Sequence, residues 1–410
     1  MASENRVIKN TAMLYLMNIA KMVFPLITLP YLTRVLSVDC YGMVSYVKAV
    51  MQYMQIIVDF GFILSGTKDI VLAKNNPQKL YEENGNILVS RLLLSGVAFV
   101  ILCIVIIAIP ILRANAVYTL LSFGFVFLTN FLLDYLFRGL EKMAVITYTF
   151  VAMKAVSTAL TFTFVKNDSD ILWIPVLDLV GICIAIGLIS HEVKKMGIRF
   201  KPTGIIAAWG KIKDSTVYFF SNMATTAFMA LNTLLIGIFI QTEQVAYWSV
   251  CLQMITAVQS LYTPLTNGIY PHMVKTKDIT VVNKALKLYM PIITLGCIFT
   301  LIVAKYALRI VGGPQYVVAA PVLRCLVPVL FFSFLSMIYG WPVLGSIGKQ
   351  KETTITTVVT AAIQIAGLVL LIITHHFTLI YISLLRGMTE ALLFLLRFRY
   401  YRIFRNEFAA

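Results

Sequence analysis

The chain is poor in charge, and acids are the scarcest of its charged residues. Only 13% of the 410 residues are charged, and 34 lysines and arginines stand against 18 aspartates and glutamates. A soluble domain of this length needs far more surface charge, so the composition excludes that class. Hydrophobic residues make up 60% of the chain and the mean hydropathy is +0.86, which predicts a polytopic membrane protein.

Patterns for metal and thiol chemistry are also scarce. The six cysteines lie mostly within apolar runs and none has C-x-x-C spacing, so we interpret them as small packing residues. Two of the four histidines, His375 and His376, are adjacent, but no carboxylate stands near them. We therefore expect no metal site, no disulfide and no cofactor.

Apolar runs of about 20 residues, the length that crosses a bilayer as a helix, recur along the whole chain. We expect an all-α integral membrane protein with about 12 transmembrane helices. The predicted spans are 10–33, 41–64, 87–110, 116–137, 144–165, 171–190, 215–240, 245–270, 285–305, 321–345, 354–374 and 377–398.

The formal net charge of +16 is best explained by topology. Most lysines and arginines fall in the short loops that lie on one side of the membrane when the N-terminus is cytoplasmic, as the positive-inside rule requires. We therefore place both termini in the cytoplasm. A nucleic-acid partner, which a basic chain could also suggest, is not expected.

A basic segment divides the chain near its midpoint. We predict an N-terminal six-helix bundle at 1–190, a cytoplasmic basic linker at 191–214 and a C-terminal six-helix bundle at 215–410. A faint internal repeat supports two halves, because the order acid, Tyr, Ser, Gln recurs in 39–55 and 243–260. The linker either only connects the halves or lies along the inner membrane surface, with four apolar residues toward lipid: Ile205, Ile206, Trp209 and Ile212.

Polar residues recur at helical spacing along six of the predicted spans. In 41–64 they stand alternately four and three positions apart, so they share one face of a helix. Stripes of this length in both halves favour a water-filled lumen, although polar residues between membrane helices also serve as packing contacts alone. The stripes are Asn18, Lys21, Pro25 and Thr28; Tyr41, Ser45, Lys48, Gln52, Gln55 and Asp59; Thr147, Lys154, Thr158 and Thr161; Tyr218, Asn222, Thr225 and Asn232; Ser249, Gln253, Thr256, Ser260, Thr263 and Asn267; and Thr353, Thr357, Thr360 and Gln364.

Ionisable residues inside the spans are sorted by sign along the membrane normal. Such residues usually face a watery cavity or a partner and mark a transport pathway. At middle or outer depth lie the five cations that we interpret as a substrate-binding, cationic lumen: Lys21, Lys48, Lys154, Arg324 and Arg386. Four acids are candidates for gating or ion coupling, of which only the third shares the depth of the cations: Asp59, Asp134, Asp178 and Glu390.

Intrahelical pairing is the simpler explanation for some of these charges. Asp134 and Arg138, and likewise Arg386 and Glu390, are four positions apart and could neutralise each other on one helix. For Arg386 the pair and the substrate role stay open. Lys21 and Lys48 have no such intrahelical partner, so they are the leading candidates for the site.

Two N-terminal runs resemble a known family. They are PLITLPYLTRVL with the following YG, at 25–42, and DFGFILSGTK, at 59–68, and a later GGPQY turn at 312–316 fits the same pattern. The chain resembles the bacterial O-antigen and capsule repeat-unit flippases of the multidrug, oligosaccharidyl-lipid and polysaccharide (MOP) exporter superfamily. The resemblance implies two six-helix bundles, as in the MATE exporters, and charged residues that line the cavity.

The same resemblance implies a transporter rather than an enzyme. Its substrate would be an undecaprenyl-pyrophosphate-linked oligosaccharide that moves from the cytoplasmic to the periplasmic leaflet of the bacterial inner membrane by alternating access. Membrane lipids and other polysaccharide assembly proteins would be its partners. Two alternatives remain: a cation-coupled multidrug exporter, for which an acidic cavity is expected, and a polysaccharide polymerase or glycosyltransferase, for which a large outer loop or an acidic metal motif is expected.

Overall fold

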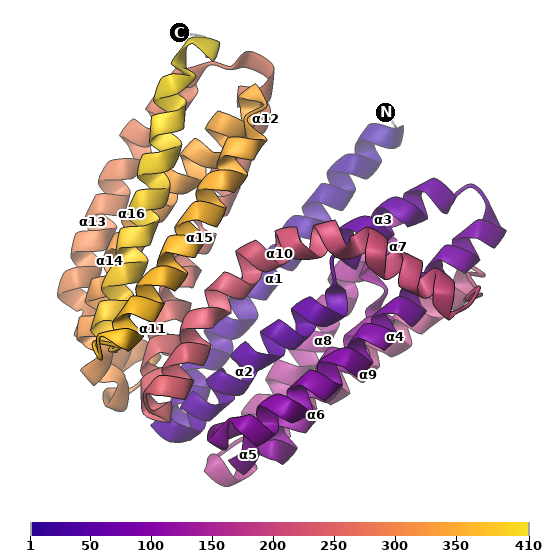
Figure 1. Ribbon diagram of the computed structural model, residues 1–410, viewed down its shortest axis with the longest axis horizontal. Coiled ribbons are helices and arrows are strands. Elements are labelled where there is room, and N and C mark those ends of the chain that lie inside the picture. Colours follow the sequence, from indigo (N-terminus) through magenta and orange to yellow (C-terminus); the bar gives the residue numbers. More distant parts are fainter. Residues whose placement is uncertain (1, 409–410) are drawn as a thin grey trace. The chain divides into compact units, whose positions relative to one another are not determined.

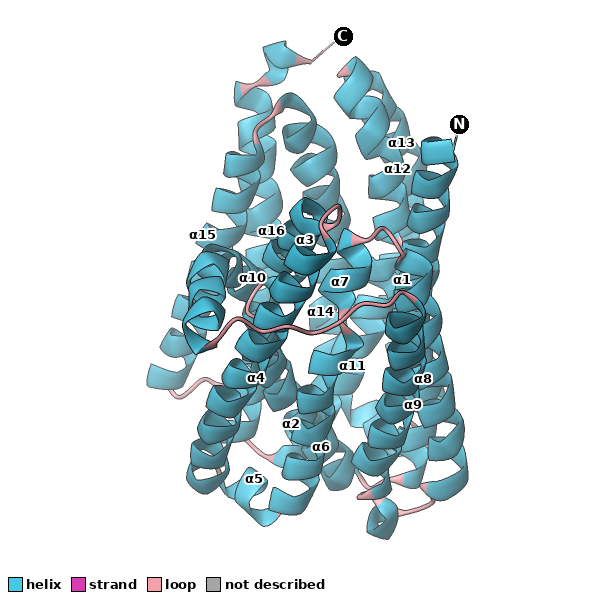
Figure 2. Ribbon diagram, turned by 90° about the vertical axis from the view of Figure 1, so that its right-hand side faces the viewer, coloured by secondary structure: helices cyan, strands magenta, loops and turns pink. Residues whose placement is uncertain are grey.

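Residues 2–408 are described by a computed structural model, and the elements in this range are all helices (Figures 1 and 2). Side chains are described from Asn10 onward, except those of residues 221, 222 and 224–229. Asn222 and Thr225, which belong to one predicted polar stripe, therefore lie outside the described side chains. The chain divides into two compact units, Met1–Leu234 and Leu235–Ala410.

The first unit contains nine complete α-helices and most of a tenth. A 3-10 turn, Thr129–Leu132, joins α6 to α7. The helices are α1 (Ala2–Val35), α2 (Val38–Asp59), α3 (Phe62–Ala73), α4 (Pro77–Ala108), α5 (Pro110–Ala114), α6 (Ala116–Leu128), α7 (Asp134–Gly139), α8 (Met143–Phe164), α9 (Trp173–Lys195) and α10 (Ile205–Phe239).

The second unit contains the end of α10 and six further α-helices. A 3-10 turn, Pro314–Ala319, precedes α14, and a π-helical segment, Tyr339–Leu344, follows it. The helices are α11 (Thr242–Ser260), α12 (Tyr262–Thr276), α13 (Ile279–Val311), α14 (Ala320–Ile338), α15 (Gln350–Ile373) and α16 (Leu379–Ile403).

Within the described residues, nine helical segments are long and apolar enough to cross a membrane. The three other predicted spans, 41–64, 215–240 and 245–270, coincide with α2 and α3, with α10, and with α11 and α12. Two of these spans are broken into shorter helices, and the third contains the apolar stretch Ala230–Phe239 next to side chains that are not described. The all-helical, multispan fold predicted from the sequence is confirmed.

The two compact units meet within α10, whereas the predicted linker ends at residue 214. The physical reason lies in the contacts of the first half of α10. Ser215 hydrogen-bonds Ser65 of α3 at 2.7 Å, and Phe219 stacks on Phe60 with ring centroids 4.3 Å apart. These contacts attach residues 205–219 to the first unit. The assignment of two six-helix bundles and a separate linker stays a prediction.

Several predicted spans are interrupted by non-helical backbone. Phe60 and Gly61 adopt left-handed conformations between α2 and α3, and Leu133 does so directly before α7. In the second unit, Gly340 departs from helical geometry within the π-helical segment, which also contains Pro342. Such breaks leave backbone groups that neighbouring protein must satisfy inside a membrane.

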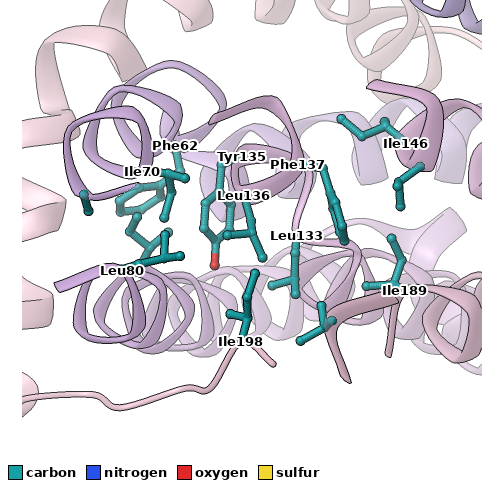
Figure 3. Close-up of a cluster of buried hydrophobic side chains, with 14 of the residues drawn as sticks. Phe62, Ile70, Leu80, Leu133, Tyr135, Leu136, Phe137, Ile146, Ile189 and Ile198 are labelled. Atoms are coloured by element: carbon teal, nitrogen blue, oxygen red, sulfur yellow. The ribbon is translucent and has the colours of Figure 1, made fainter. Parts of the chain in front are cut away.

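An apolar core holds the two short half-helices α3 and α7 together. Phe62 and Ile70 of α3 pack with Leu136 and Phe137 of α7, and all four side chains are at most 1% exposed (Figure 3). Tyr135 lies in the same cluster and donates its hydroxyl to Asn84 Oδ1 of α4 at 2.9 Å. The half-helices are thereby joined to α4 as one packed layer.

Glycine is required at the break between α2 and α3. Gly61 has φ of 80°, and a Cβ there would lie 2.6 Å from the Cβ of Tyr218 on α10. We expect Gly61→Ala to lower the stability of the first unit by at least about 1–2 kcal/mol, since the left-handed backbone alone costs that much for a residue with a Cβ. Thermal unfolding of the purified protein in detergent measures the change.

Gly96→Ala is the matched control. Gly96 lies within α4 and has no neighbouring atom within 4 Å of the position of a Cβ, so the same substitution should leave the unfolding temperature unchanged or raise it slightly. Equal unfolding temperatures for the two variants would show that the close approach at Gly61 is not required.

Candidate functional site

A cavity of about 440 Å³ lies inside the first unit. Five helices supply its lining residues: α1, α2, α6, α8 and α9. These helices pack in the order α1, α8, α9, α6, α2. The contact between α1 and α2, at the two ends of this series, involves only a few residues. The cavity is therefore lined by helices of a single unit.

Three of the predicted polar stripes converge on this cavity. Lys21, Pro25 and Thr28 line it from α1, and the stripe of α2 adds Lys48 and two glutamines. Helix α8 contributes the third stripe. Because one face of each helix repeats every three to four residues, the spacing places the members of each stripe on one side of their helix, and part of each stripe lines the cavity. The members that line the cavity are Lys21, Pro25, Thr28, Lys48, Gln52, Gln55, Lys154, Thr158 and Thr161.

Three lysines and one aspartate are the charged residues of the lining. Lys154 Nζ of α8 lies 3.0 Å from Asp178 Oδ1 of α9, and Ser157 donates its hydroxyl to the same oxygen at 2.7 Å. This pair neutralises one of the three cations. Lys154 also lies over the ring of Phe125, 5.1 Å from its centroid.

Lys21 and Lys48 are not neutralised in the described structure. Neither forms an ion pair there, and both side chains are exposed although each helix is apolar on either side of them. Lys21 lies over the ring of Phe150 at 5.5 Å. An ammonium at membrane depth that lacks a protein counterion requires water or an anionic ligand. The cavity thus has an excess of positive charge.

Aromatic rings and uncharged polar groups form the rest of the wall. Phe24, Tyr118, Phe125 and Phe150 present ring surface, and α2 contacts the 3-10 turn after α6 through a hydrogen bond from Gln55 Nε2 to Thr129 Oγ1 at 3.1 Å. A small set of polar groups in a largely aromatic wall is typical of sites that bind organic ligands.

Asp59 and Asp134 are not among the residues that line the cavity. Asp59 Oδ1 lies 2.8 Å from Arg91 Nη2 of α4, at the break between α2 and α3. Asp134 is the first residue of α7, but no ion pair with Arg138 forms in the part of the chain described. The predicted intrahelical pair of Asp134 and Arg138 is therefore absent from the described structure, whereas Asp59 pairs with Arg91 of another helix.

Arg91 was missed as a partner by reasoning from the sequence. It stands near the start of an apolar run, where positive-inside bias already explains an arginine. Its side chain is nevertheless buried, and it lies 6.0 Å from the ring centroid of Tyr135. The signal that could have found it is its position inside the predicted span 87–110, opposite an acid in the preceding span.

Arg324 and Arg386 belong to the second unit and are not part of the cavity. Arg386 Nη2 lies 3.3 Å from Glu390 Oε2, so the predicted intrahelical pair forms. Ser336 of α14 donates its hydroxyl to Glu390 Oε1 at 2.9 Å. Arg324 donates Nε to the backbone carbonyl of Leu301 on α13 at 2.9 Å.

A buried polar network surrounds this pair between α14, α15 and α16. Arg397 donates to the carbonyl of Ser336 at 2.6 Å and to Thr357 Oγ1 at 3.0 Å, and Thr389 donates to Gln364 Oε1 at 2.6 Å. The polar stripe of α15 therefore packs between helices, as the packing alternative predicts. Arg397 falls within the predicted span 377–398, and its side chain is buried.

No group of three or more His, Cys, Asp or Glu side chains that could hold a metal ion occurs among the residues whose placement is described. The arrangement offers instead a positively charged, aromatic cavity, which suits an anionic organic ligand.

Comparisons with known proteins show the family of the chain. Residues 7–277 match the family described as "Polysaccharide biosynthesis protein". Two curated relatives carry the name "Putative O-antigen transporter". The relative from Shigella dysenteriae is 28% identical over 68% of this chain and 70% of its own length, and that from Escherichia coli K12 is 26% identical over 84% of this chain and 85% of its own.

Solved structures agree on the fold. An inward-facing multidrug resistance MATE family transporter of the MOP superfamily superposes with a TM-score of 0.65 at 14% sequence identity, over 95% of both chains. The prediction made from the motifs at 25–42 and 59–68 is confirmed. The chain has the fold of the MOP superfamily and belongs to the polysaccharide biosynthesis protein family.

Proposed function

We propose that this protein is a membrane transporter that moves a lipid-linked oligosaccharide across the bacterial inner membrane during polysaccharide biosynthesis. The observation that carries the proposal is the cavity of the first unit, with Lys21 and Lys48 uncompensated at membrane depth. The family and the names of the curated relatives support the substrate class. The substrate that fits this chemistry is an undecaprenyl-pyrophosphate-linked repeat unit.

Two ammonium groups in a cavity of low dielectric bind a phosphate group far more strongly than they would in water. Lysine is suited to this role because it presents a compact charge with three donors. The pyrophosphate or an acidic sugar would lie between Lys21 and Lys48, and the other sugars would lie against the aromatic wall. The lipid tail would stay in the bilayer.

Movement of such a substrate requires that the cavity open to each side in turn. Pro25 and Pro30 interrupt the hydrogen bonding of α1, and left-handed backbone breaks two other spans. Helix breaks of this kind are where transporters change shape. We propose alternating access with both termini cytoplasmic, and a role in gating or ion coupling for Asp59, Asp134, Asp178 and Glu390.

Arg324 and Arg386 remain part of the proposed substrate path, but with weaker support than the three lysines. Arg324 donates to backbone and Arg386 is paired with Glu390, so neither offers an uncompensated charge as Lys21 and Lys48 do.

A multidrug exporter of the same fold is the rival function. The solved MATE transporter that superposes is only 14% identical, so that likeness concerns the fold alone. Cationic drugs would be repelled by a cavity with excess positive charge. The polymerase and glycosyltransferase alternatives receive no support from the family or from the curated relatives.

Lys21→Ala and Lys48→Ala test the site. At about 8 Å and an effective dielectric constant of about 20, one charge contributes about 2 kcal/mol to anion binding. Each variant should therefore bind undecaprenyl pyrophosphate roughly thirtyfold more weakly, and a strain that depends on it should lose surface polysaccharide. Binding to the purified protein and immunoblots of surface polysaccharide measure these effects.

Lys305→Ala is the matched control, because Lys305 is exposed on α13 outside the cavity. It should bind and export as the unaltered protein does, with equal membrane levels in all strains. Full surface polysaccharide in both cavity variants would contradict the assigned site.

The pair Lys154 and Asp178 gives a second test, based on the net charge of the cavity. Asp178→Asn leaves Lys154 uncompensated and should strengthen undecaprenyl pyrophosphate binding by about tenfold, whereas Lys154→Ala leaves Asp178 uncompensated and should weaken it by a similar factor. The double variant restores the original net charge and should bind like the unaltered protein. Isothermal titration measures all three.

Loss of binding in all three variants, with unchanged unfolding temperatures, would show that the pair shapes the cavity rather than setting its charge.

A further inference from the structure

Residues 194–213 form a surface that the transport cavity does not use. We call it the linker platform and define it by its exposed members: Lys194, Lys195, Phe200, Arg199, Lys201, Ile205, Ile206, Trp209 and Lys213. It begins at the end of α9 and extends into the first turns of α10 (Figure 1).

The loop part of the platform is attached to α4 by hydrogen bonds. Asn86 Oδ1 accepts from the backbone nitrogen of Thr203 at 2.8 Å, and Tyr81 donates its hydroxyl to the carbonyl of Gly197 at 2.8 Å. The backbones also approach closely, since a Cβ at Gly85 would lie 2.6 Å from the nitrogen of Pro202. The loop is therefore held against the first unit.

The inner face of α10 is fixed as firmly. Ala208 and Ile212 are buried, and Ser90 of α4 donates to the carbonyl of Ala208 at 2.8 Å. Lys211 lies 2.8 Å from Asp69 of α3 and 2.5 Å from Glu83 of α4. Burial alone would lower the pKa of Lys211, but its hydrogen bonds to the two carboxylates outweigh this and raise the pKa, so it stays charged at neutral pH.

The outer face of α10 is apolar and uncovered in the first unit. Ile205, Ile206 and Trp209 are 70%, 91% and 65% exposed. Ile212, which the sequence also placed toward lipid, is only 7% exposed, because it packs into the apolar core of the first unit. A cluster of exposed large apolar residues marks a contact surface.

Positive charge surrounds this apolar patch. Lys194, Lys195, Arg199, Lys201 and Lys213 are all exposed, and Asp214 is the one acid beside them that is exposed within this stretch of the described chain. Apolar residues including Trp, bordered by cations, are typical of helices that lie in the headgroup region of a membrane. Each cation near an anionic leaflet contributes about 1 kcal/mol.

We propose that the linker platform binds the surface of a leaflet that contains anionic phospholipids. Ile205, Ile206 and Trp209 enter the headgroup region, and the cations contact lipid phosphates. A membrane is favoured over a protein partner by charge complementarity and by position, since the platform begins where the apolar span 173–195 ends. The proposed function places both termini in the cytoplasm, and only the assignment of this leaflet to the cytoplasmic side rests on it.

Quenching of Trp209 by brominated lipids tests the proposal. The full-length protein and Trp209→Phe are reconstituted in nanodiscs that contain brominated phosphatidylglycerol or, at the same bromine content, brominated phosphatidylcholine. The difference between the two proteins isolates the signal of Trp209. We expect brominated phosphatidylglycerol to quench the Trp209 fluorescence at least about twofold more than brominated phosphatidylcholine does. Added salt should reduce this preference.

Charge variants show whether the platform causes the preference. Replacement of Lys194, Lys195, Arg199 and Lys201 by Gln should abolish it. The matched control removes four exposed lysines elsewhere, Lys275, Lys277, Lys284 and Lys287, and should keep it. Equal quenching by the two lipids, or quenching of Trp209 by aqueous iodide but by neither lipid, would overturn the proposal.

The outcome is independent of the proposed transport function. The measurement reports only where Trp209 lies, so it is unaffected by whether the cavity lysines bind a pyrophosphate. Loss of transport in the lysine variants with unchanged Trp209 quenching, or the reverse, separates the two proposals.

Discussion

The cost of placing charge in a bilayer governs the arrangement of this protein. An unpaired ammonium or carboxylate at membrane depth is expensive, so each must find a counterion, a backbone carbonyl or water. Three ion pairs form: Asp59 with Arg91, Lys154 with Asp178, and Arg386 with Glu390. A carbonyl serves Arg324. Among the predicted intramembrane cations, only Lys21 and Lys48 lack such a partner in the described structure, and both line the cavity.

The same cost explains why the helix breaks lie beside charges. Asp59 ends α2 directly before the left-handed Phe60, and Asp134 begins α7 directly after the left-handed Leu133. A carboxylate at the first turn of a helix is favoured by the helix dipole. Arg91 reaches Asp59 from α4 and lies over the ring of Tyr135, so one guanidinium contacts both broken segments.

Helical periodicity made much of this arrangement predictable. The spacing of Lys48, Gln52 and Gln55 placed them on one face, and they line one wall of the cavity. Periodicity does not reveal which helix lies opposite, so the partners of Asp59 and Arg397 could not be found. It also does not locate a left-handed residue when that residue is Phe60 or Leu133 rather than glycine, since only tertiary packing maintains such backbone.

The cavity and the linker platform both present positive charge where anionic groups of lipids can lie. A lipid-linked oligosaccharide carries its charge at the junction of tail and sugar, so a transporter must attract that charge while leaving the tail in lipid. A cavity with net positive charge would attract the charged group. A helix that is tied to α3 and α4 through Lys211, with its apolar face outward, would hold the same unit at the depth where lipid headgroups lie. Positive charge at both places therefore suits the anionic groups of lipids: a pyrophosphate in the proposed site and phospholipid headgroups at the proposed platform.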